Sequence, residues 1–191
     1  MNEEDKYVKL TRVFICIEFP DSMIKEIARV QEVLGNKMFT GKMIELENLH
    51  LTLKFLGEID DHMLEKVKER LAEIRFDSFE AKLGELGTFT SHGKPRIVWA
   101  KINGDGIWAL QKKIDDALKD LFKPEERFMS HTTIARVKYV KDGSTFNDYV
   151  KNIGSKEIKF NINDFKLKSS ELGRIGPVYT DIEEYEFEKK S

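Results

Sequence analysis

Residues 50–53 of the chain read HLTL and residues 131–134 read HTTI, so the pattern His-x-Thr-apolar occurs once in each half of the sequence. Side chains alternate between the two faces of a β-strand, so the histidine and threonine of each pattern share a face. The apolar residues fill the opposite face. Only nine of the 191 residues are threonine, so a chance repeat of this pattern is uncommon. We therefore expect two strands that each bury one side and offer an imidazole and a hydroxyl on the other.

Strand and helix signals alternate outward from these two stretches. Apolar residues at helical spacing predict four helices, two of which begin after Asp21-Ser22 and Asp60-Asp61 and two of which cover residues 107–121 and 144–153. Strands are expected over residues 10–19, 49–56, 96–102, 131–139, 158–162 and 178–187.

Strand–helix–strand order occurs twice, which predicts a mixed architecture of helices and strands with an internal duplication. One irregularity stands in the last third of the chain. The apolar alternation of Ile158, Phe160 and Ile162 changes parity before Phe165. That change predicts a β-bulge near residues 163–164.

Composition describes a globular protein with a well-solvated surface, because 40% of the 191 residues are hydrophobic and 35% are charged. The formal net charge of −2 argues against a protein that binds long duplexes through a broad basic field. Basic residues do cluster locally, over residues 94–101 and 136–141. These clusters are compatible with an enzyme that binds a few phosphates.

The compartment follows from what the sequence lacks. Residues 1–6 are acidic and have no apolar stretch of the signal-peptide type, and no apolar run is long enough to span a membrane. Cys16 is the lone cysteine, so it cannot form an internal disulfide and fits a reducing compartment. We expect a cytoplasmic protein without a membrane partner.

The chemistry that suits this inventory is phosphodiester hydrolysis by acid and base. Such a reaction deprotonates a water and protonates a leaving alkoxide, and imidazole can do either near neutrality. His50 and His131 are the candidates, while Thr52 and Thr133 can donate hydrogen bonds to phosphate oxygens. His62 and His92, the remaining two histidines, lack the motif and are expected at the surface.

A catalytic metal or a bound nucleotide cofactor is not expected. The chain has four His and one Cys without the spacing of a metal site, and it has no glycine-rich phosphate loop. We therefore expect neither a metal nor a cofactor.

At this point the sequence resembles the 2H phosphoesterase superfamily, which is named for two His-x-Thr motifs. It most resembles the RNA 2′,3′-cyclic phosphodiesterase branch, historically called 2′-5′ RNA ligase. The resemblance covers nearly the whole chain and rests on residues 12–20, 47–57, 87–99 and 170–179, which include ENLHLTLKFLG, GTF followed by PRIVW, and SEL followed by GPVY.

The resemblance implies an α+β fold over residues 1–191, a single bilobal domain with internal duplication, two antiparallel sheets each backed by helices, and a central cleft. It also implies hydrolysis of an RNA 2′,3′-cyclic end to a 2′-phosphomonoester without a metal. By motif position, His50 is the proton donor and His131 the acceptor, with Thr52 and Thr133 on the phosphate. The implied substrates are single-stranded RNA ends or tRNA fragments with a 2′,3′-cyclic phosphate, and we expect a monomer.

Two further residues are candidates for substrate binding. Lys54 has the parity to face the phosphate, whereas Phe55 is expected on the buried face with Leu51 and Leu53. Arg136 is a substrate-binding position by resemblance, yet simple alternation places it opposite His131, so only a twist or a bulge would bring it into the cleft.

The chain also departs from the family pattern at three positions. Met43 stands where many relatives have an aromatic residue that could stack on a base. Ser130 and Thr132 stand where proline and an aliphatic residue are more usual.

Three alternatives remain open from the sequence. The chain could be a 2′-5′ RNA ligase that runs the same chemistry in reverse, or a non-catalytic module that binds RNA or nucleotides. It could also hydrolyse cyclic nucleotides or ADP-ribose cyclic phosphate, which would differ only in what the cleft admits.

Overall fold

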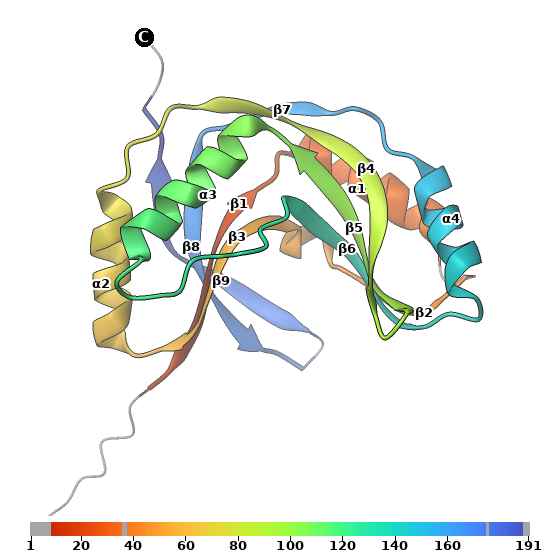
Figure 1. Cartoon of the computed structure of the whole chain (residues 1–191), viewed down its shortest axis with the longest axis horizontal. Helices are drawn as coiled ribbons and strands as arrows, with labels where there is room; N and C mark the ends of the chain where they lie inside the picture. The colour runs from red at the N-terminus through yellow and green to blue at the C-terminus, as the bar shows by residue number, and fades with distance from the viewer. Residues whose placement is uncertain (1–8, 36–37, 175, 189–191) are drawn as a thin grey trace, which may run out of the picture.

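The computed structural model describes residues 9–35, 38–174 and 176–188, and these residues form two antiparallel sheets with four α-helices (Figure 1). The acidic residues 1–6 lie outside the described part. The first sheet has the order β3-β1-β8-β9 and the second the order β2-β6-β5-β4-β7. The first contains β1 (Thr11–Glu18), β3 (His50–Ile59), β8 (Asp164–Leu172) and β9 (Pro177–Glu186); the second contains β2 (Thr40–Met43), β4 (Phe79–Ser91), β5 (Lys94–Asn103), β6 (His131–Tyr139) and β7 (Lys159–Ile162).

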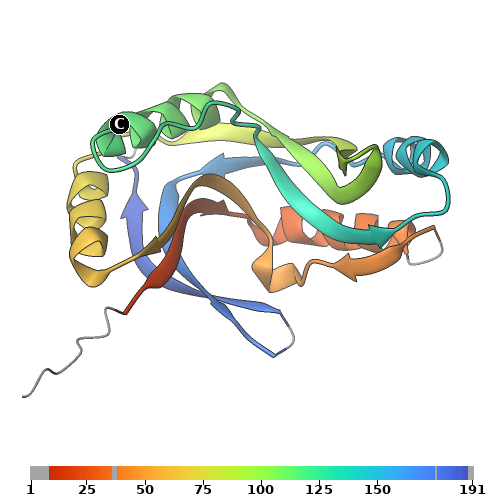
Figure 2. The ribbon, with the colours of Figure 1, turned by 60° about the horizontal axis from the view of Figure 1, so that its bottom comes forward.

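The helices are exchanged between the two sheets. α1 (Asp21–Leu34) follows β1 of the first sheet but packs on the second sheet beside α4 (Gly143–Ile153) (Figure 1). α3 (Asp105–Leu118) follows β5 of the second sheet but packs beside α2 (Asp61–Ala72) on β3 of the first sheet, while also contacting β4 of the second. Figure 2 shows these two helix pairs at opposite ends of the molecule. The expected α+β architecture with two helix-backed sheets is confirmed. The exchange was not foreseen, and it ties the halves together because each supplies a helix to the other's core.

The helices begin close to the expected positions. Asp60 caps α2 by accepting a hydrogen bond from the backbone N–H of Met63 at 2.7 Å, as the sequence predicts. α1 differs, because Pro20 occupies the cap position without a side-chain bond and Asp21 already lies in the first turn. There the carboxylate of Asp21 interacts favourably with the helix dipole instead of capping it.

The parity change near residue 163 is not a bulge. β7 ends at Ile162 in the second sheet and β8 begins at Asp164 in the first, so the chain changes sheet at Asn163. The Asn163 carbonyl accepts a hydrogen bond from the backbone N–H of Phe187 at 2.7 Å, just beyond β9. A change of sheet changes which face meets the core, and this alters parity as a bulge would.

Each histidine strand does contain a bulge, at the same distance from its histidine. On β3 the partners of Ile15 and Cys16 are Lys54 and Thr52, which leaves Leu53 unpaired. On β6 the partners of Val98 and Trp99 are Ala135 and Thr133, which leaves residue 134 unpaired. An extra residue reverses the alternation beyond it, so the fourth residue after each histidine turns inward and the fifth turns outward.

The bulge on β3 overturns the expected positions of Lys54 and Phe55. Lys54 is 4% exposed and is absent from the cleft lining, so it is not a phosphate ligand here. Its ammonium group instead contacts Asp115 of α3 at 2.5 Å and the carbonyl oxygen of Lys123 at 2.7 Å. Phe55, expected in the core, is 72% exposed and lines the cleft.

The buried pair of Lys54 and Asp115 connects β3 to the segment that leads into β6. The second carboxylate oxygen of Asp115 accepts hydrogen bonds from the Gln111 side chain at 2.7 Å and from the Glu125 backbone N–H at 2.9 Å. Removing one partner from such a pair leaves a buried charge without compensation.

We predict that Asp115→Ala lowers the free energy of unfolding by about 3–5 kcal/mol, measured by urea denaturation. The neighbouring Asp116 forms an exposed pair with Lys112 at 2.8 Å, so Asp116→Ala should cost at most about 1 kcal/mol. The double variant Lys54→Met/Asp115→Leu should recover much of the loss. Equal losses of unfolding free energy in Asp115→Ala and Asp116→Ala would show that the buried ion pair stabilises the fold no more than the exposed one.

Candidate functional site

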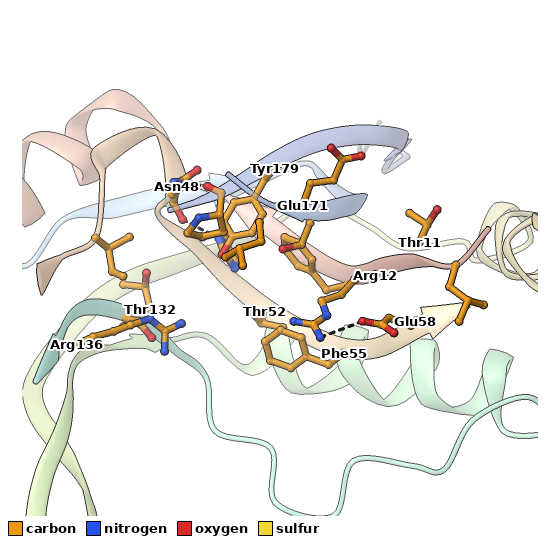
Figure 3. A pocket seen from close by; sticks show the side chains of 18 of the residues that line it. Thr11, Arg12, Asn48, Thr52, Phe55, Glu58, Thr132, Arg136, Glu171 and Tyr179 are labelled. Atoms are coloured by element: carbon orange, nitrogen blue, oxygen red, sulfur yellow. Dashed lines mark hydrogen bonds and ion pairs between the residues drawn. The ribbon is translucent and has the colours of Figure 1, made fainter. Parts of the chain in front are cut away.

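The two His-x-Thr strands meet at one cavity of about 670 Å³ between the sheets. Both expected pairs line it, His50 with Thr52 and His131 with Thr133. The strands β3 and β6 approach each other from opposite sheets, so the duplicated motif forms one site rather than two. Figure 3 shows Thr52, Phe55 and Tyr179 on one side of this space and Arg136 on the other.

Each imidazole is held by a local hydrogen bond of the same kind. Nδ1 of His50 lies 2.8 Å from the carbonyl oxygen of Asn48, and Nδ1 of His131 lies 2.7 Å from that of Met129. A carbonyl oxygen only accepts, so each Nδ1 carries the proton that it donates. In the neutral ring Nε2 then keeps its lone pair, and neither Nε2 has a hydrogen-bond partner among the described residues. Each ring is therefore prepared to accept a proton at Nε2, or to donate one when charged.

Aromatic side chains enclose both rings. The His50 ring centroid lies 5.0 Å from that of Phe14 and 5.3 Å from that of Tyr179, which meets it edge-on. Phe89 meets His131 edge-on at 4.9 Å. These contacts fix the ring orientations and remove water from around them.

Burial lowers the pKa of both histidines. The pKa of His50 falls to about 4, mainly because burial disfavours the charged ring, while the bond to the Asn48 carbonyl acts in the opposite direction. Lys168 and His131 lower this pKa further by charge repulsion, and the negative charge of Glu18 acts against them. The pKa of His131 is lowered by burial and supported by the Met129 carbonyl. Both rings are therefore mainly neutral at pH 7 in the free protein, and an anion bound between them would raise both pKa values.

The bulge on β6 brings Arg136 into the cavity. Arg136 lies beyond the unpaired residue 134 and lines the cavity, which resolves its position in favour of the cleft (Figure 3). Tyr179 lines the same cavity, and its phenol pKa is raised by burial while the positive charge of Arg136 opposes the rise. A cation beside two hydroxyl-bearing strands is suited to a phosphate.

Positions that depart from the family pattern lie mainly in the core. Ser130 and Thr132 are each 1% exposed, and their buried hydroxyls have no hydrogen-bond partner in the described part of the chain. Thr132 nevertheless contributes to the cavity lining. Met43 is half-buried and packs against the hydrophobic core. His62 and His92 are exposed, as expected.

Sequence reasoning did not select several residues that line the cavity. Tyr179 belongs to a stretch that carries the resemblance, and Phe14 alternates with the buried Val13 and Ile15, so both left a signal in the sequence. For Phe55 the sequence pattern predicted burial instead, because its exposure depends on the bulge. At the rim, Arg12 forms an exposed ion pair with Glu58 at 3.1 Å (Figure 3).

Residues 9–35, 38–174 and 176–188 contain no group of three or more His, Cys, Asp or Glu side chains arranged to hold a metal ion. None of the helices in these ranges is long and apolar enough to cross a membrane.

Comparison with known proteins finds relatives that match most of the chain. A protein of Methanocaldococcus jannaschii named RNA 2′,3′-cyclic phosphodiesterase is 34% identical over 177 residues, covering 91% of this chain and 99% of that protein. One of the same name from Thermotoga maritima is 33% identical over 181 residues, covering 93% and 96%.

Solved structures share the fold. The crystal structure of TT0787 of Thermus thermophilus has a TM-score of 0.75 at 26% identity, with 94% of this chain and all of that chain covered. Escherichia coli LigT complexed with 3′-AMP has a TM-score of 0.76 at 20% identity, with 94% and 99% covered. The family model described as LigT like Phosphoesterase matches residues 17–99 and 103–179. The chain therefore belongs to the family of LigT-like phosphoesterases within the 2H superfamily.

Proposed function

We propose that this protein hydrolyses the 2′,3′-cyclic phosphate at an RNA end to a 2′-phosphomonoester, without a metal and by a two-histidine mechanism. The observation that carries the proposal is the pair of imidazoles in one cavity, each donating from Nδ1 to a carbonyl two residues upstream. Relatives named RNA 2′,3′-cyclic phosphodiesterase, at 33–34% identity over most of the chain, support the substrate class.

The mechanism needs one neutral and one charged imidazole. Nε2 of neutral His131 takes a proton from water as the water oxygen attacks phosphorus, and the bond from phosphorus to the 3′-oxygen breaks. Nε2–H of charged His50 gives its proton to that departing oxygen. The products are a 3′-hydroxyl and a 2′-phosphate, and the two histidines have exchanged protonation states. This assignment of donor and acceptor follows motif position, because the hydrogen bonds of the two rings are alike.

The remaining cavity residues suit a nucleotide with an anionic phosphate. Thr52 and Thr133 would donate to non-bridging oxygens, and Arg136 would neutralise the charge that these oxygens hold. The exposed ring of Phe55 at the cavity offers a face on which a base can stack, in place of the aromatic residue absent at Met43. Single-stranded RNA ends or tRNA fragments meet these requirements.

We also propose that the chain acts as one bilobal domain and a monomer in the cytoplasm. The exchanged helices support a single domain, since each half lends a helix to the other. Cys16 is buried and unpaired, which fits a reducing compartment.

We predict that His50→Ala and His131→Ala each lower kcat on a short RNA with a 2′,3′-cyclic end by on the order of 10²–10⁴-fold, because each ring performs its own proton transfer. His62→Ala and His92→Ala are matched controls at exposed histidines and should stay within about twofold. The measurement is steady-state hydrolysis in excess chelator, where wild-type activity should persist. Loss of activity in chelator that zinc or magnesium restores would refute the metal-free mechanism.

The depressed histidine pKa values predict a distinctive pH dependence. The profile of kcat/KM reports the free protein, so its alkaline limb should fall below pH 6.5, the ordinary histidine pKa, because burial makes the rings lose their protons earlier. The profile of kcat reports the bound complex, where the phosphate anion favours charged imidazole and should move that limb to higher pH. Both profiles can be measured from about pH 4 to 9. A kcat/KM limb above pH 7 would contradict the pKa lowering.

A further inference from the structure

A second cavity of about 390 Å³ lies along β4, between residues 85–90 of that strand and α4. Trp99 of β5 lies over Gly87 of β4, where a Cβ atom would come within 2.3 Å of the indole. Glycine at this position therefore leaves room for the ring. Asn147 and Lys151 of α4 close the other side. The pairing of β7 with β4 ends at Lys82 and is followed by a bond from the Leu83 N–H to the Ile158 carbonyl, so residues 86–90 of β4 have no strand partner on this edge in the described structure.

This cavity is joined to the proposed active site by a row of rings. Trp99 pairs across the strands with Thr133, so both side chains lie on the same face of the second sheet. The centroid of Phe89 lies 5.6 Å from that of Trp99 and 4.9 Å from that of His131. A ligand that leaves the imidazole of His131 along this face meets an indole after one intervening ring.

The cavity at β4 is lined by one acidic and one basic residue, Glu85 and Lys151. Lys151 is exposed and forms no ion pair with a described residue. On the sheet, Lys101, two residues beyond Trp99 on β5, forms an ion pair with Glu85 at 3.3 Å. An aromatic ring on the face of His131 is a surface on which a base of single-stranded nucleic acid can stack.

We propose that the rings of Phe89 and Trp99 form a shelf that binds the nucleotide that precedes the cyclic end, so that the preferred substrate is an RNA strand rather than a cyclic mononucleotide. The inference rests on the proposed function and extends it to substrate length. A terminal 2′,3′-cyclic ribose continues only through its 5′-oxygen, so the preceding nucleotide extends from that side of the terminal ribose. The shelf begins at Phe89, whose ring centroid lies 4.9 Å from that of His131, and supplies the stacking surface that this nucleotide requires.

The test compares uridine 2′,3′-cyclic phosphate with a uridine trinucleotide that ends in the same cyclic phosphate. One additional stacked base should raise kcat/KM for the trinucleotide about 5- to 150-fold, mainly through a lower KM. Trp99→Leu should remove this advantage and leave the mononucleotide within about twofold, while Trp99→Phe should keep part of it. The matched control is Trp108→Leu, at a tryptophan that is 51% exposed on α3, which should change neither substrate.

Three results would overturn the shelf. They are equal rates for the two substrates in the wild type, an equal loss on both in Trp99→Leu, or a trinucleotide advantage that survives this change.

A direct binding measurement separates failure of the shelf from failure of the proposed function. The chain has two tryptophans, so in Trp108→Phe the fluorescence reports Trp99 alone. Saturable quenching by the trinucleotide supports the shelf even if neither substrate is hydrolysed. Unchanged fluorescence at saturating trinucleotide overturns it, even if both substrates are hydrolysed.

Discussion

The carbonyl oxygens of Asn48 and Met129 each accept a hydrogen bond from the imidazole two residues further along the chain, and the chemistry of the cleft depends on these two bonds. They decide which ring nitrogen holds the proton, and therefore which one is available to a substrate. Because the acceptor is backbone, the interaction needs no third catalytic side chain. It requires only that the chain enter each strand in the same way, and the internal duplication provides this.

The strands then determine what accompanies each histidine. A bulge three residues after the histidine makes the fifth residue share its face, which is Phe55 in one strand and Arg136 in the other. The duplicated backbone thus presents an aromatic ring from one half and a cation from the other. The fourth residue turns inward, and in β3 this is Lys54, whose ion pair with Asp115 anchors the segment leading to His131. One irregularity of the backbone therefore serves both the cleft and the packing behind it.

Much of this arrangement could be predicted from the sequence, because local patterns encode it. Alternation placed His50 with Thr52 and His131 with Thr133, and helical spacing located the four helices closely. The sequence could not reveal features that depend on pairing between distant strands. The faces of Lys54 and Phe55 follow from the bulge where β3 pairs with β1. The change of sheet at Asn163 alters the apolar alternation of the sequence in the same way as a bulge would, so the sequence alone does not distinguish the two. The helix exchange likewise depends on tertiary packing, because the apolar stripe of α1 shows which face of the helix is buried but not which sheet it covers.

The central claim is that the two histidines divide the proton transfers between them, and a substrate with sulfur in place of the bridging 3′-oxygen tests it most directly. A thiolate leaves readily without a proton, whereas the attacking water still needs a base. The account predicts that His50→Ala recovers much of its lost rate on the sulfur-bridged RNA, while His131→Ala stays slow. If both variants remain equally impaired on the sulfur and oxygen substrates, neither histidine acts as the acid, and the account is contradicted.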